Sequence, residues 1–411
     1  MAQEASHENP AISSALETVA AKNGDSALSR MPALDGLRGT AILIVLCTHF
    51  YEYKGIAPYL DATPFRLLWR LVHFGWCGVD LFFVISGFLI TSILLNTKES
   101  TGYFKSFYGR RAVRIFPLYF LCLFLYYHVP LSIFRIAPGL PHSTHEIWFW
   151  SYLANWKIPQ WQSDELGLFW SLCVEEQFYF IWPLVIWFTS KRTLPWVCLG
   201  MMGVSLAAGI GFEFAGLPRL YVFLASVPRA EGIILGSLLA WLVRQSWLPR
   251  VTDQLKLALP ASFGLMFLCA LDPPYFRGLY TLEISIAAVS WSALLLHCYV
   301  NPESLAARSM RCSLLRSVGK YSYAIYVLHA WVMYYVFQYG VPLVKTYLPS
   351  KPALLAVFAL QLCFSYLAGF LSWHLFEKHF LRLKKYFPYR VSSPNSVERA
   401  TVASAEIALA D

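Results

Sequence analysis

The sequence predicts an all-α, polytopic membrane protein of about ten transmembrane helices, with both termini in the cytoplasm. Three observations indicate this class. Of the 411 residues, 57% are hydrophobic and only 14% are charged, whereas about 25% of the residues in a soluble domain are charged. The apolar residues form blocks, several of which reach the roughly 20 residues that a helix needs to cross a bilayer. The basic residues lie mainly in short segments between these blocks.

Ten apolar blocks are the expected membrane spans. In chain order they cover residues 37–53, 75–95, 115–134, 168–189, 195–213, 220–243, 257–272, 281–299, 321–343 and 352–375. A further apolar stretch, 148–156, is too short to cross the bilayer, so we expect it to be interfacial or re-entrant.

The distribution of positive charge sets the expected orientation. With ten spans and the N-terminus inside, 23 of the 33 Lys and Arg residues fall on the cytoplasmic side, in agreement with the positive-inside rule. This topology explains the formal net charge of +9 without nucleic acid as a partner. Residues 1–33 and 391–411 are polar, and we expect them to be disordered tails around a membrane domain at 34–390.

Two polar residues, Arg38 and His49, lie on the first expected span and are eleven positions apart. Eleven residues at 100° each come within about 20° of three full turns, so both side chains point the same way. A rise of about 16 Å separates them, which is roughly half of the hydrocarbon core. Arg38 is therefore expected at the cytoplasmic edge and His49 in the outer half of the membrane.

Further ionisable residues lie inside other expected spans. They are Asp80, Glu175, Glu176, Arg229, Glu231 and His329. Because a lone charge in lipid is costly, we expect these groups to face one another or a watery cavity that opens outward. Asp80 and Glu175 are the candidates for orienting the His49 imidazole or balancing its charge.

A second polar cluster is expected at the cytoplasmic edge. Arg111 and Arg114 precede the third span and share one helix face, since they are three positions apart. Together with Arg38 they suit a phosphorylated or anionic ligand, because guanidinium groups bind phosphate well. Arg110 is interpreted as a topology signal and Ser86 as a small helix-packing residue.

Two segments resemble metal-binding motifs only loosely. In "HLFEKHF", the spacing of His374, Glu377 and His379 does not match the pattern His-x-x-Glu-His. The loop "HSTHE", which begins at His142, has no evident third ligand. We therefore predict no metal site.

Five sequence blocks resemble the acyltransferase-3 family of integral membrane acyltransferases. "LDGLRGTAILIVLCTHF" matches the family's opening, with its Arg-x10-His pattern, and "GVDLFFVISGFLI", "RRAVRIFPLYF", "WSLCVEEQFYFIWP" and "YSYAIYVLHA" match later blocks in the same order. The resemblance covers roughly residues 33–385. It implies an O-acyltransferase of the bacterial inner membrane that moves an acyl group, often acetyl from acetyl-CoA, to sugars of lipopolysaccharide or exopolysaccharide. Other members modify nodulation factors or macrolides.

The resemblance also implies roles for individual residues and partners. The family's first-span histidine and paired arginine correspond to His49 and Arg38, and its Arg-x-x-Arg motif corresponds to Arg111 and Arg114. Acyl-CoA, a glycan or lipid-linked sugar and membrane lipids are the expected partners, with no permanently bound cofactor. Some members append an extracytoplasmic SGNH-type domain, whereas this chain ends soon after its last expected span. The membrane domain is therefore expected to act alone or with a separate extracytoplasmic protein.

Two functional hypotheses follow. In the first, acyl-CoA enters from the cytoplasm, its phosphates meet Arg38, Arg111 and Arg114, and its thioester reaches His49. His49 then acts as general base on the acceptor hydroxyl or carries the acyl group itself, and the sequence leaves both roles open. The rival is a transporter or flippase for a lipid-linked sugar, which would also need intramembrane charges. The arginine cluster in register with His49 favours the enzyme.

Overall fold

The computed structural model describes residues 31–52, 71–72, 74–129, 145–160, 166–248, 252–271 and 280–391. This part of the chain is helical, apart from loops and one antiparallel pair of two-residue strands, β1 (Ser100–Thr101) and β2 (Arg390–Val391). The expected all-α fold is confirmed.

The helices fall into long and short elements. The longer helices are α2 (Pro32–Glu52), α5 (Gly78–Thr97), α6 (Tyr103–His128), α8 (Trp170–Phe188), α9 (Leu194–Phe214), α12 (Glu231–Leu242), α13 (Thr252–Ala270), α14 (Tyr280–Val300), α17 (Ser322–Tyr335) and α19 (Ser350–Ser372). The shorter ones are η1 (Phe74–Cys77), α7 (Glu146–Trp150), η3 (Ala154–Trp156), η4 (Ile158–Gln160), η5 (Gly167–Phe169), α10 (Arg219–Leu224), α11 (Ser226–Arg229), α15 (Leu305–Met310), α16 (Ser313–Lys320), η8 (Val336–Gly340), α18 (Val341–Tyr347), η9 (Trp373–Glu377), α20 (Lys378–Leu381) and η10 (Arg382–Tyr386).

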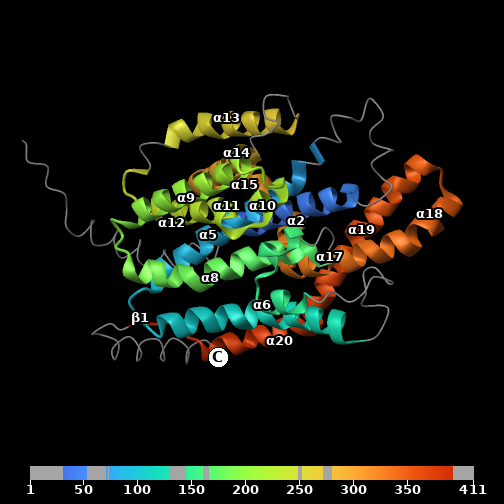
Figure 1. The fold of residues 1–411 in the computed structure, drawn as a ribbon, viewed down its shortest axis with the longest axis horizontal. Helices are drawn as coiled ribbons and strands as arrows, with labels where there is room; N and C mark the ends of the chain where they lie inside the picture. Colours follow the sequence, from blue (N-terminus) through green and yellow to red (C-terminus); the bar gives the residue numbers. More distant parts are fainter. Residues whose placement is uncertain are drawn as a thin grey trace, which may run out of the picture.

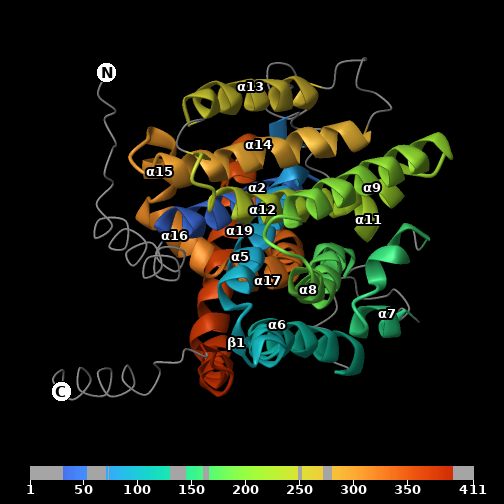
Figure 2. The same cartoon turned by 90° about the vertical axis from the view of Figure 1, so that its left-hand side faces the viewer.

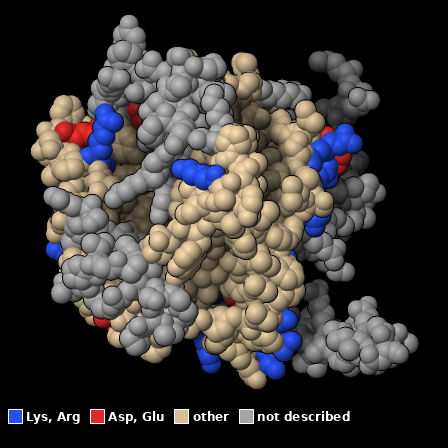
Figure 3. Space-filling view, turned by 90° about the vertical axis from the view of Figure 1, so that its right-hand side faces the viewer, with Lys and Arg blue, Asp and Glu red and all other residues tan. Residues whose placement is uncertain are grey.

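Six helical segments in the described part of the chain are long and apolar enough to cross a membrane. They are Pro32–Phe50, Phe74–Thr97, Leu194–Phe214, Tyr280–Val300, Ser322–Tyr347 and Pro352–Tyr386. Large apolar side chains are also exposed on the surface, such as Phe188 at 82% and Phe214 at 88%. Figure 3 shows one face on which the described side chains are mostly uncharged. The chain is therefore an integral membrane protein.

The expected count of ten spans stays a prediction. The third and fourth expected spans form α6 and α8, which carry arginines and glutamates respectively and are not among the six segments above. The sixth is divided into α10, α11 and α12, because Ala225 adopts an extended conformation between α10 and α11. The stretch 148–156 lies in α7 and η3, which are too short to cross, as expected.

The long helices run roughly side by side (Figures 1 and 2). In Figure 1, α13 and α14 lie along one side, α6 and α20 along the other, and α5, α8 and α12 between them. Helices α2 and α5 are central, because each contributes to two hydrophobic clusters. One cluster includes residues of α6, α8 and α17, and the other includes residues of α12, α13 and α14.

The ends of the membrane domain differ slightly from those expected. Helix α2 begins at Pro32, so Pro32 and Ala33 belong to the folded domain rather than to the N-terminal tail. Ala33 is buried against Cys298 and Ala307, which explains why the helix extends this far. At the other end, Val391 pairs with Ser100 in the small sheet. The remaining residues of both expected tails lie outside the described part of the chain.

Helices α5 and α12 pack closely through glycines. A Cβ atom added at Gly87 would lie 1.9 Å from the Ile233 carbonyl oxygen, and one added at Gly236 would lie 2.0 Å from the Val84 carbonyl oxygen. Only hydrogen fits at either position, so the two backbones come together as they do at small-residue interfaces of membrane helices. This contact fixes α5, which carries several residues of the site described below.

The first prediction tests this contact. Gly87→Ala should lower the free energy of unfolding by about 1–3 kcal/mol, because the added methyl group overpacks the interface. The thermal midpoint of the purified protein in detergent measures the effect. Gly200→Ala is the matched control, since a Cβ there meets no atom within 4 Å. Equal stability of the two variants would contradict close packing at Gly87.

Candidate functional site

A cavity lined by basic side chains lies between α2, α5, α6 and the C-terminal segment. Its volume is about 520 Å³. The lining cations are Arg38, Arg110, Arg111, Arg114 and Lys384, and among the described residues no carboxylate lines it. We call this space the basic cavity. Its positive lining suits a ligand with several negative charges.

The arginines of the basic cavity are largely without acidic partners. Within the described residues, the one ion pair within 4 Å involving Arg38, Arg111 or Arg114 joins Arg38 to Asp35 at 3.6 Å. The Asp35 side chain is 47% exposed, so water screens that pair. The Arg111 guanidinium lies 5.2 Å from the centre of the Tyr179 ring. The positive charge of Arg111 and Arg114 is therefore available to a ligand.

The C-terminal segment completes the basic cavity. The Arg110 Nε donates a hydrogen bond of 2.7 Å to the Phe387 carbonyl, and the Ser106 hydroxyl donates one of 2.6 Å to the Pro388 carbonyl. The Phe387 ring covers Gly109, where a Cβ atom would lie 2.2 Å from the ring. These contacts bring Lys384 to the arginines of α6. Arg110 is thus part of the cavity wall as well as a basic residue beside a span.

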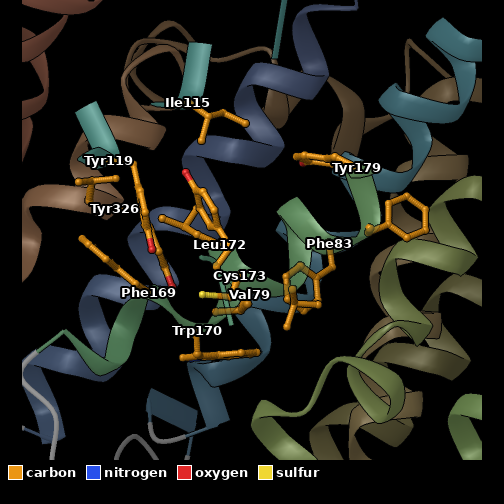
Figure 4. Packing of buried hydrophobic residues seen from close by; sticks show 14 of the residues in the cluster. Val79, Phe83, Ile115, Tyr119, Phe169, Trp170, Leu172, Cys173, Tyr179 and Tyr326 are labelled. Carbon is orange, nitrogen blue, oxygen red and sulfur yellow. The ribbon is translucent and has the colours of Figure 1, made fainter. Parts of the chain in front are cut away.

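A smaller, polar cavity of about 90 Å³ adjoins the basic cavity. We call it the inner cavity. Arg38, Arg111 and Arg114 line both spaces, so the two are contiguous. The remaining lining residues come from α5, α6, α8 and α17, and Figure 4 labels six of them: Val79, Phe83, Ile115, Leu172, Tyr179 and Tyr326.

Glu175 supplies the carboxylate of the inner cavity. The Ser86 hydroxyl donates a hydrogen bond of 2.9 Å to its Oε1, and the Tyr179 hydroxyl donates one of 3.0 Å to its Oε2. Both carboxylate oxygens therefore accept hydrogen bonds from neighbouring hydroxyl groups. Ser86 was expected to pack between helices, and the structure adds this hydrogen bond to Glu175 of α8. No pattern within α5 alone indicates that Glu175 of α8 lies opposite it.

His49 lies beside a second histidine. The ring centres of His49 and His329 are 5.2 Å apart, and the His329 ring lies 5.6 Å from that of Tyr326. The His329 Nδ1 lies 2.5 Å from the Tyr326 carbonyl oxygen, which can only accept. This hydrogen bond places a proton on Nδ1, so a neutral His329 carries its lone pair on Nε2. Tyr326 lines the inner cavity and so connects it to the two histidines.

Asp80 pairs with Arg229 in the interior of the helix bundle. The Arg229 Nη2 is 3.0 Å from the Asp80 Oδ1, and both side chains are fully buried. The rings of Phe83, Trp170 and Phe223 surround the guanidinium at 4.9–5.5 Å. The two charges therefore compensate each other inside the bundle.

Of the residues named from the sequence, the structure groups some and separates others. It brings Arg38, Arg111 and Arg114 together, with Glu175 in the adjoining space. The His49 ring contacts His329. The Asp80 carboxylate pairs with Arg229, and the Glu175 carboxylate accepts from Ser86 and Tyr179, so the role of either at the His49 imidazole stays a prediction. Glu231 accepts a hydrogen bond of 2.8 Å from the Ser285 hydroxyl.

The fold and site define an integral membrane protein with a cation-lined cavity that opens into a polar space inside its helix bundle. The chain belongs to the acyltransferase-3 family, because the family's acyltransferase domain matches residues 31–374. The expected family resemblance is thus confirmed over most of the chain.

Two curated relatives show the extent of the similarity. The O-acetyltransferase OatA of Staphylococcus aureus (strain NCTC 8325 / PS 47) is 28% identical over 338 residues, which cover 76% of this chain and 52% of the relative. The Bacillus subtilis (strain 168) protein named "Putative peptidoglycan O-acetyltransferase YrhL" is 29% identical over 329 residues, which cover 73% of this chain and 48% of the relative. The chain thus spans about half the length of these relatives. No solved structure matches it.

The second prediction concerns the Asp80–Arg229 pair. Arg229→Met should destabilise the protein by about 3–5 kcal/mol, because it leaves a buried carboxylate without its partner. The double variant Asp80→Asn with Arg229→Met removes both charges and should recover most of that loss. Thermal unfolding in detergent measures both. A double variant of normal stability that had lost its catalytic turnover would instead place Asp80 in the chemistry.

Proposed function

We propose that this protein is an O-acyltransferase of a bacterial inner membrane, with acetyl-CoA or a related acyl-CoA as donor. The acceptor is a hydroxyl group on a sugar of a cell-envelope or exported glycan. The observation that carries the proposal is the basic cavity, where five cations meet without a lining carboxylate among the described residues. Coenzyme A carries several phosphate charges on one molecule, and clustered arginines and lysines bind phosphate through charge-assisted hydrogen bonds.

The order of the two cavities supports a direction for the reaction. The basic cavity lies near β1, in the segment expected to face the cytoplasm, where acyl-CoA is available. With the phosphates held there, the pantetheine arm extends past Arg38, Arg111 and Arg114 and brings the thioester into the inner cavity. His49 lies further along the same helix, towards the expected outer face. We assign His49 to the acceptor, whose hydroxyl proton it takes as general base.

Family membership and the relatives' names support the reaction class. OatA is named an O-acetyltransferase, and the name of YrhL specifies peptidoglycan as its target. Peptidoglycan, lipopolysaccharide and exopolysaccharide all present sugar hydroxyls outside the cytoplasm, and the acceptor of this chain belongs to that chemical class. A separate extracytoplasmic protein that completes the transfer is compatible with the same donor site.

One assay separates this function from lipid-linked sugar transport. The protein is reconstituted into vesicles and incubated with acetyl-CoA carrying a radiolabelled acetyl group, together with a glycan extract from bacterial envelopes. Label recovered in the glycan supports acyl transfer. Label that stays on coenzyme A while a lipid-linked glycan crosses the bilayer supports the flippase, which intramembrane charges also suit.

The third prediction tests the donor site. Changing Arg111 and Arg114 together to Gln should weaken acetyl-CoA binding at least tenfold, since a hydrogen bond to a charged group contributes about 1.5–3 kcal/mol. Lys at both positions should restore part of the affinity, because charge remains but the bidentate geometry is lost. Isothermal titration calorimetry measures the affinity.

The matched control for the donor site is Arg311→Gln. Arg311 pairs with the exposed Glu303 at 3.3 Å and does not line the basic cavity. Its loss should leave acetyl-CoA affinity unchanged. Affinity equal to wild type in the Arg111/Arg114 double Gln variant would remove these arginines from the donor site.

The fourth prediction tests His49. His49→Ala should lower acyl transfer to the glycan by about 10²–10⁴-fold, which is the usual contribution of a general base. Acetyl-CoA affinity should hardly change, because about 16 Å of helix rise separates His49 from Arg38. His49→Gln should not rescue activity, since an amide cannot take a proton at neutral pH.

The control histidine is His128, which pairs with Glu146 at 2.7 Å and is 46% exposed. His128→Ala should transfer acetyl groups at the normal rate. If His49→Ala also retained most of its turnover, the imidazole would be a packing group, and the proton would have to pass to another residue.

A further inference from the structure

Ser86 is placed as a nucleophile would be. Its hydroxyl lies in the inner cavity, 2.9 Å from the Glu175 carboxylate, to which it donates a hydrogen bond. A third group, the Tyr179 hydroxyl, holds the other carboxylate oxygen at 3.0 Å. A nucleophile within hydrogen-bond reach of a base, with the base oriented by a third group, is the recurring arrangement of covalent catalysis.

Three other hydroxyls of the inner cavity have partners that are not carboxylates. Ser171 and Tyr326 share a hydrogen bond of 2.6 Å with each other, and Tyr326 also contacts the Leu168 carbonyl. The Tyr323 hydroxyl donates to the Ile115 carbonyl at 2.6 Å. Among the described lining residues, Ser86 is thus the aliphatic hydroxyl that donates a hydrogen bond to a carboxylate.

We propose that Ser86 is a catalytic residue that accepts the acyl group from acyl-CoA and holds it as an ester before the sugar receives it. This inference rests on the proposed function and adds a covalent intermediate to it. The location supports it, because the inner cavity adjoins the basic cavity where the donor is bound. A carrier at Ser86 keeps the acyl group in the bundle after coenzyme A has left towards the cytoplasm.

The first half-reaction forms the ester. The Ser86 oxygen attacks the thioester carbonyl carbon, and its proton passes to the Glu175 carboxylate. Arg38, Arg111 and Arg114 line the same space and supply N–H donors for the negative charge that develops on the carbonyl oxygen. The carbon–sulfur bond breaks, and coenzyme A leaves as a thiolate beside these guanidinium groups.

The second half-reaction releases the acyl group. The acceptor hydroxyl attacks the ester carbonyl and gives its proton to His49. The bond to the Ser86 oxygen breaks, and that oxygen takes back the proton held by Glu175. His49 then loses its proton to water, which balances the thiolate released earlier. Ser86, Glu175 and His49 all return to their starting states.

The experiment looks for the ester itself. Purified protein is incubated with radiolabelled acetyl-CoA in the absence of acceptor, quenched in acid and digested, and the labelled peptide is located by mass spectrometry. We expect label on Ser86 in the wild type, and more of it in His49→Ala, in which the second half-reaction is slow. Ser86→Ala should carry no label and should transfer acetyl groups at least 10²-fold more slowly. Its acetyl-CoA affinity should stay within about twofold of wild type.

Ser237→Ala controls for loss of a buried serine beside α5. Ser237 is fully buried on α12, and its hydroxyl bonds the Ile233 carbonyl at 2.9 Å outside both cavities. This variant should acquire label and turn over normally. Ser86→Cys provides a second check that does not depend on the stability of the Ala variant, because an acyl-cysteine thioester should form and be released by neutral hydroxylamine.

The outcomes separate this inference from the proposed function. Glycan acetylation with no label at Ser86 in either the wild type or His49→Ala would overturn the inference and leave the function intact. Label on His49 instead of Ser86 would also overturn the inference and leave the function intact. A Ser86→Ala variant that kept more than a tenth of the normal turnover would have the same consequence. If acetyl-CoA neither bound nor acetylated any glycan, the proposed function would fail, and the inference with it.

Discussion

The structure depends on where positive charge is placed in a low-dielectric helix bundle. A guanidinium removed from water is costly unless an anion, a cavity or an aromatic face compensates it. Arg38, Arg111 and Arg114 meet around two contiguous cavities, and their one ion pair within the described residues is with Asp35. Such a group of cations is most favourable when a polyanion occupies it. This charge distribution therefore supports the proposed donor site.

A second buried arginine, Arg229, differs from these three because it has a close acidic partner within the bundle. Arg229 has Asp80 at 3.0 Å and three aromatic rings around it, so an acidic partner compensates its charge. A pair of this kind holds α5 to the start of α12 and leaves no charge for a ligand. The contrast distinguishes the two groups: the arginines proposed to bind the donor are those without a close acidic partner, whereas the more deeply buried Arg229 has one.

Much of this arrangement follows from the sequence. The apolar blocks predict an all-α membrane protein, and the spacing of Arg38 and His49 predicts their shared helix face. The three arginines are predicted to meet because topology brings the start of the third span to the cytoplasmic edge. Contacts between distant segments are not predicted in this way. Lys384 reaches the cavity only because Phe387 packs on Gly109, and Ser86 becomes a site residue only because α8 places Glu175 opposite it.

The same limit applies to Asp80 and to the sixth expected span. Sequence position puts Asp80 at the right depth for His49, but it gives no rotation of α5 about its axis. Close packing at Gly87 and Gly236 fixes that rotation and turns Asp80 towards Arg229. Likewise, an unbroken apolar block from 220 to 243 indicates one helix, whereas the extended backbone at Ala225 divides it. Local periodicity predicts helices, and packing against a neighbour then decides which side chains meet.

A series of neighbouring side chains leads from the two cavities to His49. Arg38 and Glu175 line the inner cavity with Tyr326, and the Tyr326, His329 and His49 rings follow one another at 5.6 and 5.2 Å. The cations proposed to bind the donor lie at one end, and an imidazole pair lies near the expected outer face. An acyl group is small and uncharged, so a space of about 90 Å³ can admit it on the end of the pantetheine arm but is too small for the nucleotide of coenzyme A. In the proposed function, selection by size and charge thus lets the acyl group enter the bundle while the nucleotide stays on the cytoplasmic side.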